Sequence, residues 1–234
     1  MDSRVGEILE TSRYAVFFGG AGVSTESGIP DFRSKDGLYN QKFSVSPEEM
    51  LSHTYFVNHT AEFFRFYKEK MNCLRAKPNP AHLSLAEWER RGVIKAVITQ
   101  NIDGLHQMAG SRCVLELHGS VRRNYCYRCR KFYDADVIFS ADGVPTCTCG
   151  DVIKPDVVLY EEALDTNTVK EAIRHIESAD TLIVAGTSLT VYPAAGYVQY
   201  FRGENLILIN RDPTPLDGQA TLCIREPVGE VLGM

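Results

Sequence analysis

Four of the seven cysteines lie close together in the sequence, at a spacing typical of a metal site. Two residues separate Cys126 from Cys129, seventeen separate Cys129 from Cys147, and one separates Cys147 from Cys149. Two such pairs can bring four thiolates onto one tetrahedral Zn²⁺, as in a zinc ribbon, although the second pair is one residue shorter than usual. Four thiolates leave no open coordination position, so we predict one structural zinc. The alternative is four unligated thiols in a loop.

A glycine-rich segment is suited to bind phosphate. The apolar run Tyr14 to Phe18 leads into Gly19-Gly20-Ala21-Gly22-Val23-Ser24-Thr25. A glycine-rich turn between a strand and a helix lets the backbone approach a pyrophosphate, and the helix N-terminus adds amides and a partial positive charge. This turn therefore indicates a nucleotide ligand. The dinucleotide fingerprint has a third glycine where this chain has Thr25, so a turn that only packs helix on sheet is the alternative.

The elements that must position these residues follow an alternating pattern. Short apolar runs alternate with helical patterns, which predicts an α/β fold with a parallel sheet covered on both faces. After the first strand at Tyr14 to Phe18, strands are expected at Val93 to Thr99, Val114 to Leu117, Thr181 to Ala185 and Leu206 to Ile209. Asn79, followed by Pro80, is expected to cap a helix that stops at Gly92, and Asp165 to cap one through Ser178.

Two stretches interrupt this alternation. Residues 35–76 are aromatic and helix-prone, and residues 120–154 carry the four clustered cysteines. We therefore expect one domain over 1–234, with a Rossmann-like large part at about 1–34, 77–119 and 155–234. The two insertions are expected to form a smaller zinc-ribbon and helical module beside the parallel sheet.

Composition narrows the function classes. The 234 residues are 44% hydrophobic and 24% charged, which is typical of a globular protein with a sizeable core. The net charge of −5 and the pI near 5.7 disfavour direct nucleic-acid binding and an anionic membrane surface. The apolar runs are shorter than the roughly 20 residues that cross a bilayer. The N-terminus has no apolar signal-peptide core, so we expect a reducing, cytoplasmic location.

Seven short motifs then follow one another along the chain. They are GAGVSTESGIPDFR from Gly20 to Arg33, TQNIDGLH from Thr99 to His106, LHG from Leu117 to Gly119, the four cysteines, KPDVV from Lys154, GTSL from Gly186 and IN from Ile209. In this order they resemble the sirtuin family over nearly the whole chain. The resemblance implies a Rossmann-like large domain, a zinc and helical module, and a cleft between them for NAD and an acyl-lysine peptide.

The resemblance also implies an activity. Sirtuins are NAD-dependent protein lysine deacylases that consume NAD and release nicotinamide, O-acyl-ADP-ribose and free lysine. His118 matches the family's general base, and an imidazole that titrates near neutrality suits proton withdrawal from a ribose hydroxyl. Asn101 matches the residue that organises the ribose and a water, and Asp103 the residue that binds the nicotinamide carboxamide. His106 is the competing histidine, and the resemblance assigns it structure more than chemistry.

Further residues match the family's NAD contacts. Phe32 is expected to shield the reactive ribose carbon from water, which would suppress NAD hydrolysis, and Arg33 to supply a cation for the phosphates. Thr187, Ser188 and Asn210 match contacts on the adenosine side, at the ends of strands. The full predicted set for NAD is Gly20, Ala21, Gly22, Thr25, Phe32, Arg33, Gln100, Ile102, Asp103, Gly186, Thr187, Ser188 and Asn210.

The acylated peptide is expected to bind by strand addition between residues 157–162 and 189–192. The predicted contacts are Val157, Val158, Tyr160, Glu162 and Leu189. Here the chain has Tyr160-Glu161-Glu162 where the family usually has Phe-Gly-Glu. The lost glycine puts the loop geometry in question, and the added carboxylate is expected to make the rim acidic and to favour basic flanking residues.

The resemblance also narrows the range of acyl groups that the site is expected to accept. Sirtuins that prefer acidic acyl chains such as succinyl resemble one another in a Tyr-x-x-Arg pair, and the matching positions here are Phe64 and Tyr67. Without the arginine, we expect Phe64 and Tyr67 to line a pocket for acetyl and other neutral acyl groups. Two other readings remain: a mono-ADP-ribosyltransferase or NAD hydrolase that uses the same pocket, and a catalytically silent NAD-binding module.

Overall fold

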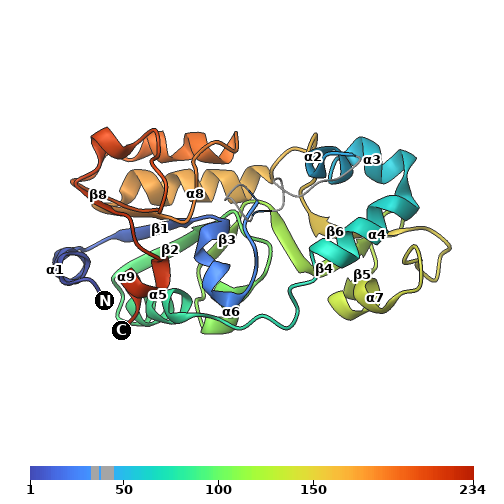
Figure 1. The fold of residues 1–234 in the computed structure, drawn as a ribbon, viewed down its shortest axis with the longest axis horizontal. Coiled ribbons are helices and arrows are strands. Elements are labelled where there is room, and N and C mark those ends of the chain that lie inside the picture. The colour runs from blue at the N-terminus through green and yellow to red at the C-terminus, as the bar shows by residue number, and fades with distance from the viewer. Residues whose placement is uncertain (33–36, 38–44) are drawn as a thin grey trace.

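A six-stranded parallel sheet forms the larger group of elements (Figure 1). The computed structural model describes residues 1–32, 37 and 45–234, so the predicted NAD contact Arg33 lies outside the described residues. The strand order is β3-β2-β1-β7-β8-β9. Their bounds are β1 Ala15–Gly19, β2 Ile94–Thr99, β3 Val114–Glu116, β7 Thr181–Ala185, β8 Asn205–Ile209 and β9 Leu222–Ile224. The predicted α/β class is confirmed, and only the three-residue β9 was not anticipated in this sheet.

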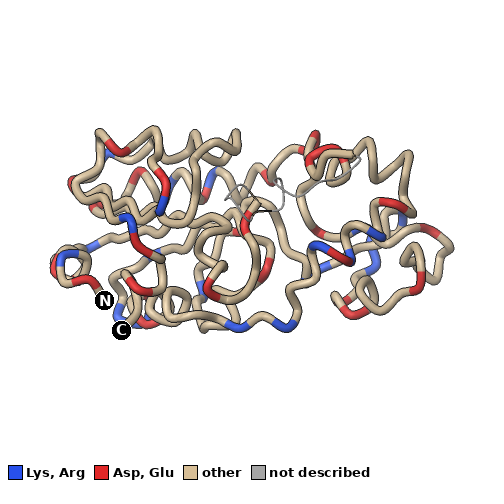
Figure 2. Tube along the Cα trace, in the orientation of Figure 1, with Lys and Arg blue, Asp and Glu red and all other residues tan. Residues whose placement is uncertain are grey.

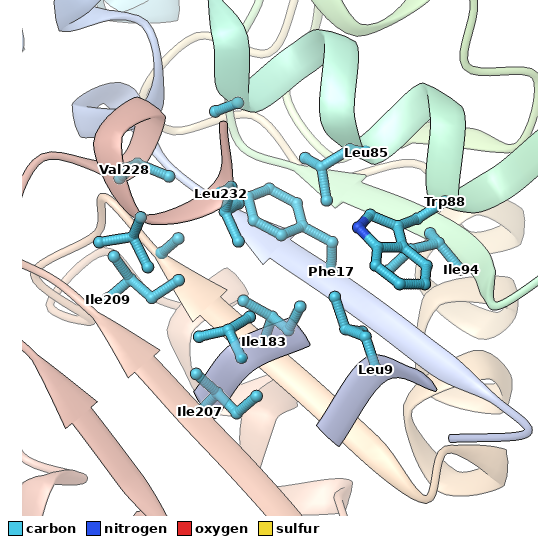
Figure 3. Close-up of a cluster of buried hydrophobic side chains, with 14 of the residues drawn as sticks. Leu9, Phe17, Leu85, Trp88, Ile94, Ile183, Ile207, Ile209, Val228 and Leu232 are labelled. Atoms are coloured by element: carbon cyan, nitrogen blue, oxygen red, sulfur yellow. The ribbon is translucent and has the colours of Figure 1, made fainter. Parts of the chain in front are cut away.

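Both faces of the sheet are buried, which explains why its central strands are continuous apolar runs. Side chains alternate along each strand, so Phe17, Ile183 and Ile207 join one hydrophobic core, while Phe18, Val184 and Leu208 join the other. Figure 3 shows the first core, where Leu85 and Trp88 pack beside Phe17.

Helices cover the two faces. The first core is closed by α1 Ser3–Thr11, α5 Pro80–Arg90 and α9 Val228–Leu232, and the second by α8 Thr166–Ser178 and the 3₁₀ segment Ala194–Tyr200. The Asn79 side chain accepts from the Ala81 amide at 2.9 Å, and the Asp165 side chain accepts from the Thr168 amide at 2.7 Å. Both predicted N-caps are therefore confirmed. A further short helix, α6 Leu105–Ala109, follows β2.

The turn after β1 differs from our expectation. It continues into two 3₁₀ turns, Ala21–Val23 and Thr25–Ser27, and not into an α-helix. Gly28 has φ +80° and Pro30 follows it, so the sequence stops a helix soon after it could begin. The turns are held from outside instead: Asn79 Nδ2 donates to the Val23 carbonyl at 2.8 Å, and Glu26 accepts from the Gly229 amide at 2.6 Å.

The second group of elements holds a three-stranded antiparallel sheet of order β5-β4-β6. Its strands are β4 Gly119–Cys126, β5 Phe132–Asp134 and β6 Ile153–Val157. Four helices pack with it around a third, aromatic-rich core: α2 Pro47–Met50, α3 His53–Asn58, α4 Thr60–Lys70 and α7 Ala135–Ser140. Figure 1 places these elements beside the carboxyl-end side of the parallel sheet.

The distribution of charged residues and the hydropathy of the helices agree with what the sequence predicts. Figure 2 shows basic and acidic residues interspersed over both groups of elements. Within residues 1–32, 37 and 45–234, no helix has the length and apolar character needed to span a membrane.

Three glycines let the turn after β1 lie directly against the turn after β7. A Cβ on Gly20 would lie 2.8 Å from Thr187 Cβ, and one on Gly22 would lie 2.7 Å from Gly186 Cα. Gly186 has φ +59°, and its Cβ would lie 2.4 Å from the Val23 nitrogen. The Gly22 amide donates to the Gly186 carbonyl at 2.8 Å. These glycines thus serve a contact between two backbone turns, in addition to any ligand.

This contact predicts a large stability effect at Gly186. We expect Gly186→Ala to lower the free energy of unfolding by at least about 2 kcal/mol, because it combines left-handed strain with a backbone overlap. The matched control is Gly218→Ala, where no atom lies within 4 Å of the added Cβ. Urea unfolding of both variants measures the difference, and equal stabilities would contradict the role given to Gly186.

Candidate active site

A cavity of about 700 Å³ lies where the parallel sheet meets the smaller group of elements. This volume is within the roughly 300–1,000 Å³ typical of small-molecule sites. The carboxyl ends of β1, β2, β7 and β8 open into it, which is where parallel α/β sheets place ligands. Nineteen predicted site residues line it: Gly20, Ala21, Gly22, Thr25, Phe32, Tyr67, Gln100, Asn101, Ile102, Asp103, His118, Val157, Val158, Tyr160, Glu162, Gly186, Thr187, Ser188 and Asn210.

His118 is held in a defined tautomer at the cavity wall. Its Nδ1 lies 2.9 Å from the Gln100 carbonyl oxygen, which can only accept, so Nδ1 carries the proton of the neutral ring. Nε2 then bears the lone pair, and no described residue hydrogen-bonds to it. Burial lowers the pKa of His118 below its usual 6.5, against the opposing effect of the Gln100 bond. The ring is therefore arranged to accept a proton at Nε2.

Ser24 joins the two polar side chains that follow β2. Its hydroxyl donates to Asp103 Oδ2 at 2.7 Å and accepts from Asn101 Nδ2 at 3.0 Å. The second Asp103 oxygen accepts from the Leu105 amide at 2.9 Å, at the start of α6. All three side chains are buried, so this network fixes the orientation of Asn101 and Asp103. Ser24 is not among the predicted site residues, although it stands inside the Gly20–Arg33 motif.

The loops after β2 and β7 are also joined by a hydrogen bond. Gln100 Nε2 donates to the Thr187 hydroxyl at 3.1 Å, and the same hydroxyl accepts from the Leu189 amide at 3.2 Å. At the end of β8, Asn210 Nδ2 donates to the Asp212 carbonyl at 2.8 Å. The polar groups around the cavity are thus set by contacts within the protein before any ligand is considered.

Two predicted substrate contacts do not reach the cavity. Phe64 is fully buried and packs edge-on against Phe63 and Phe56, with ring centroids 5.2 and 6.1 Å apart. Leu189 is 5% exposed and belongs to the core under α8. The side chains of Phe64 and Leu189 are thus taken up by neighbouring cores, and their predicted contacts with the acyl group and the peptide remain predictions.

Tyr67, one turn further along α4, does line the cavity. Its ring stacks between Phe63 and Phe139 at centroid distances of 5.6 and 5.8 Å. Its buried hydroxyl has no hydrogen-bond partner within the described part of the chain, and burial raises the pKa of this phenol well above its usual value. The position that was compared with an arginine therefore presents a neutral phenol.

The two glutamates of the Tyr160-Glu161-Glu162 segment both have hydrogen-bond partners within the chain. Glu162 contacts Lys154 Nζ at 3.0 Å and His53 Nδ1 at 2.9 Å. Glu161 accepts from the Thr54 amide at 2.9 Å, and its pKa is lowered by the Thr54 side chain first and by this amide second. Both carboxylates thus have partners within the chain, and since their pKa values are lowered they stay anionic, so the expectation of an acidic rim remains a prediction.

The four clustered cysteines meet as the zinc prediction requires. Their sulfurs all lie within 4.8 Å of one another, with Cys126 and Cys149 3.4 Å apart and Cys129 and Cys147 3.6 Å apart. A disulfide is near 2.05 Å, whereas a tetrahedron with about 2.3 Å Zn–S bonds has edges of about 3.8 Å. The donor set and its spacing therefore fit one closed zinc site. None of the four lines the cavity, which supports a structural role.

His106 is placed away from the cavity. It is buried against His82 and Phe17, with ring centroids 4.7 and 5.8 Å away. Burial lowers its pKa to about 3, so the ring is neutral throughout the physiological range. This environment is that of a core residue, in contrast to His118.

Fold and site together define a Rossmann-like α/β protein with an inserted cysteine-rich module and a cavity between the two. A family model described as Sir2 family matches residues 20–193, and the chain belongs to this family, the sirtuins. The matched residues include the glycine turn after β1, the loops after β2 and β7, His118 and the cysteine cluster.

Individual relatives agree. An NAD-dependent protein deacetylase of Clostridium perfringens is 56% identical over 100% of this chain and 98% of its own length. One of Clostridium acetobutylicum is 58% identical over 97% of this chain and 94% of its own. A structure of a Sir2 mutant with a deacetylated p53 peptide and 3′-O-acetyl ADP ribose has a TM-score of 0.90 at 43% identity, covering 99% of this chain and 96% of that one. A Sir2–p53 peptide–NAD⁺ structure has a TM-score of 0.86 at 43% identity, covering 98% and 94%.

The cysteine geometry predicts that metal content and folding are lost together. We expect one zinc per chain, and we expect Cys147→Ser to reduce both the zinc content and the folded fraction, because binding energy at a structural site is folding energy. Cys223→Ser is the matched control, since Cys223 is exposed and outside the cluster. Elemental analysis and circular dichroism measure both. Folded, freshly purified protein without zinc would refute the site.

Proposed function

We propose that this chain is an NAD-dependent protein lysine deacetylase, which converts NAD and an acylated lysine into nicotinamide, O-acyl-ADP-ribose and free lysine. Family membership and the names of its high-identity relatives support this activity. So do similar Sir2 structures with NAD⁺, with acetylated and propionylated peptides, and with 3′-O-acetyl ADP ribose. An acylated-lysine protein or peptide is thus the proposed substrate, and one structural zinc the proposed metal.

The tautomer of His118 is the observation that carries this proposal. When bound, NAD supplies a ribose carbon from which nicotinamide departs. In the proposed role, His118 Nε2 takes a proton from a ribose hydroxyl, and the Gln100 carbonyl stabilises the resulting imidazolium through Nδ1. A lowered pKa keeps the imidazole in its basic form at neutral pH. A silent NAD-binding module would not need this arrangement.

The polar network after β2 is proposed to orient NAD. Asn101 would hold the ribose and a water, and Asp103 the nicotinamide carboxamide, with Ser24 fixing both side chains. The glycine turn with Thr25 and the β7–β8 loops with Thr187, Ser188 and Asn210 would bind the phosphates and the adenosine. Gln100, Ile102 and Phe32 line the same cavity and would complete the nicotinamide end. The proposed contact of Arg33 with the phosphates is supported only by its place in the Gly20–Arg33 motif.

The peptide is proposed to lie along the segment from Val157 to Glu162. Val157, Val158, Tyr160 and Glu162 line the cavity there, and Tyr192 lines it from the facing loop. We also propose a reducing, cytoplasmic location, which is supported by four thiols suited to zinc. The division of the chain into a large part and an inserted module, with the bounds given above, is proposed as well.

Product analysis tests the proposed activity. The protein is incubated with NAD and an acetyl-lysine peptide, and with NAD alone, and the products are identified by mass. O-acetyl-ADP-ribose together with free lysine is expected only when peptide is present. ADP-ribose formed at the same rate without peptide would instead indicate an NAD hydrolase, and ADP-ribosylated protein a transferase.

The role of His118 predicts a specific loss. We expect His118→Ala to reduce deacetylation by at least about 10²–10⁴, the usual contribution of a general base, while NAD binding is largely kept. For the wild type, kcat/KM should fall only as the pH drops through a value below 6.5, since the lowered pKa extends the basic form to lower pH. His59→Ala, outside the cavity, is the control. Turnover near that of the wild type in His118→Ala would remove His118 from catalysis.

The neutral phenol at Tyr67 predicts the acyl preference. We expect acetyl-lysine to be preferred over succinyl-lysine by at least about tenfold in kcat/KM, because a carboxylate buried without a cation is costly. Among the described residues, three cations line the cavity elsewhere, Lys70, Arg75 and Arg211, and Lys70 lies 2.9 Å from Glu69, so the prediction concerns an acyl group that ends at the Tyr67 phenol. Tyr67→Arg should narrow the gap, measured with acetyl and succinyl forms of one peptide. Equal efficiencies in the wild type would contradict the charge argument.

A further inference from the structure

The segment that follows β6 is held on two sides by backbone hydrogen bonds. On one side, the Val158 amide donates to the His118 carbonyl at 3.0 Å. On the other, the Tyr160 amide donates to the Leu51 carbonyl, and the Tyr160 carbonyl accepts from the His53 amide, both at 3.0 Å. The cavity wall at residues 158–162 is therefore hydrogen-bonded to the candidate base His118 on one side and to the start of α3 on the other.

The start of α3 depends on this segment in turn. The first amides of a helix have no partner within it and must be satisfied from elsewhere. In α3 the Tyr55 amide is satisfied by the Ser52 side chain at 3.0 Å, but the His53 and Thr54 amides are satisfied by Tyr160 and Glu161. Two of the three opening amides of α3 thus bind the segment that forms the cavity wall.

Glu161 makes its contact from a strained backbone conformation. Its φ is +75°, in the left-handed region that favours glycine. A glutamate there carries backbone strain that a glycine would not. Its Oε2 accepts from the Thr54 amide at 2.9 Å, an interaction that glycine cannot make. The side-chain hydrogen bond of Glu161 therefore offsets the strain of its backbone.

Glu162 strengthens the same connection. Its Oε1 lies 2.9 Å from His53 Nδ1, and its Oε2 accepts from Lys154 Nζ at 3.0 Å and from the Leu159 amide at 2.9 Å. This carboxylate thus ties α3 to β6 and closes the turn of its own segment. Glu161 adds a bond to α3 at the outer side of that turn, where its side chain is exposed.

We infer that Glu161 is a positioning residue for the acylated peptide. Its carboxylate accepts a hydrogen bond from the Thr54 amide, a contact that we call the latch, and this contact fixes the position of the 158–162 segment along which the peptide lies. This inference rests on the proposed deacetylase function. It assigns the added carboxylate to the placement of the loop, and not to direct recognition of basic residues in the substrate.

Three substitutions at Glu161 separate the acceptor, the charge and the strain. Glu161→Gln keeps a side-chain carbonyl acceptor without charge, Glu161→Ala keeps the strain without an acceptor, and Glu161→Gly removes both strain and acceptor. We expect Ala and Gly to raise the KM for an acetyl-lysine peptide by about three- to tenfold, the range for loss of one typical intramolecular hydrogen bond. The KM for NAD and kcat should change by less than about twofold, and Gln should restore most of the peptide KM.

Each alternative has its own result. If Gly matches the wild type, backbone conformation alone places the segment and the latch is refuted. If Gln weakens only peptides with basic flanking residues and leaves neutral ones unchanged, Glu161 reads substrate charge and the inference is overturned. Parallel measurements with arginine-flanked and alanine-flanked versions of one acetyl-lysine peptide distinguish these results.

A readout without substrate separates this inference from the proposed function. Amide hydrogen exchange of Thr54 in the whole protein should be faster in Glu161→Ala than in Glu161→Gln, by about the same factor as the change in peptide KM. Equal exchange in the two variants would overturn the latch even if the enzyme is a deacetylase. If the wild type does not act on acetyl-lysine, the proposed function fails, while the exchange result still decides whether the latch exists.

Discussion

The site depends on one constraint of the parallel sheet, which is that β1 and β7 are hydrogen-bonded neighbours. From β1 the chain next builds β2 to one side, while β7, β8 and β9 extend the sheet to the other. The connections leave a crevice where the strand order reverses, and the turns after β1 and β7 meet at its floor. Gly20, Gly22 and Gly186 allow this contact, because side chains there would overlap the opposite backbone. The cavity is a consequence of this topology.

A second constraint joins the two groups of elements at the candidate base. Only Leu117 and His118 lie between the end of β3 and Gly119, which opens β4 of the smaller sheet, so two residues connect the two sheets in the chain. A Cβ on Gly119 would lie 2.0 Å from the Asp156 carbonyl oxygen, so β6 can approach His118 only because this residue is glycine. The histidine is therefore placed by contacts from both sides: Gln100 from the parallel sheet, and Val158 from the segment after β6.

Several features of the site depend on burial and on neighbours that the sequence does not show. Phe64 and Leu189 were assigned to the site by motif position, but an apolar side chain goes wherever most of its surface can be buried. The aromatic core around Phe56 and Phe63 takes up Phe64. The glycine turn was expected to open a helix, yet Gly28 and Pro30 end it within two 3₁₀ turns. Ser24 was overlooked, because a serine in a loop becomes distinctive only when Asn101 and Asp103 lie on either side of it.

The sequence by itself determined the α/β class, both helix N-caps, the zinc-type cysteine spacing and the membership implied by seven ordered motifs. These follow from local periodicity, capping chemistry and short-range spacing, which act over a few residues. Only the tertiary structure decided the tautomer of His118, the Ser24 network, the burial of Phe64 and the direction of the Glu161 and Glu162 carboxylates. Each of these depends on neighbours that the fold brings together, such as Gln100 for His118 and Thr54 for Glu161, and which group supplies a hydrogen bond or a packing surface is settled only when the chain has folded.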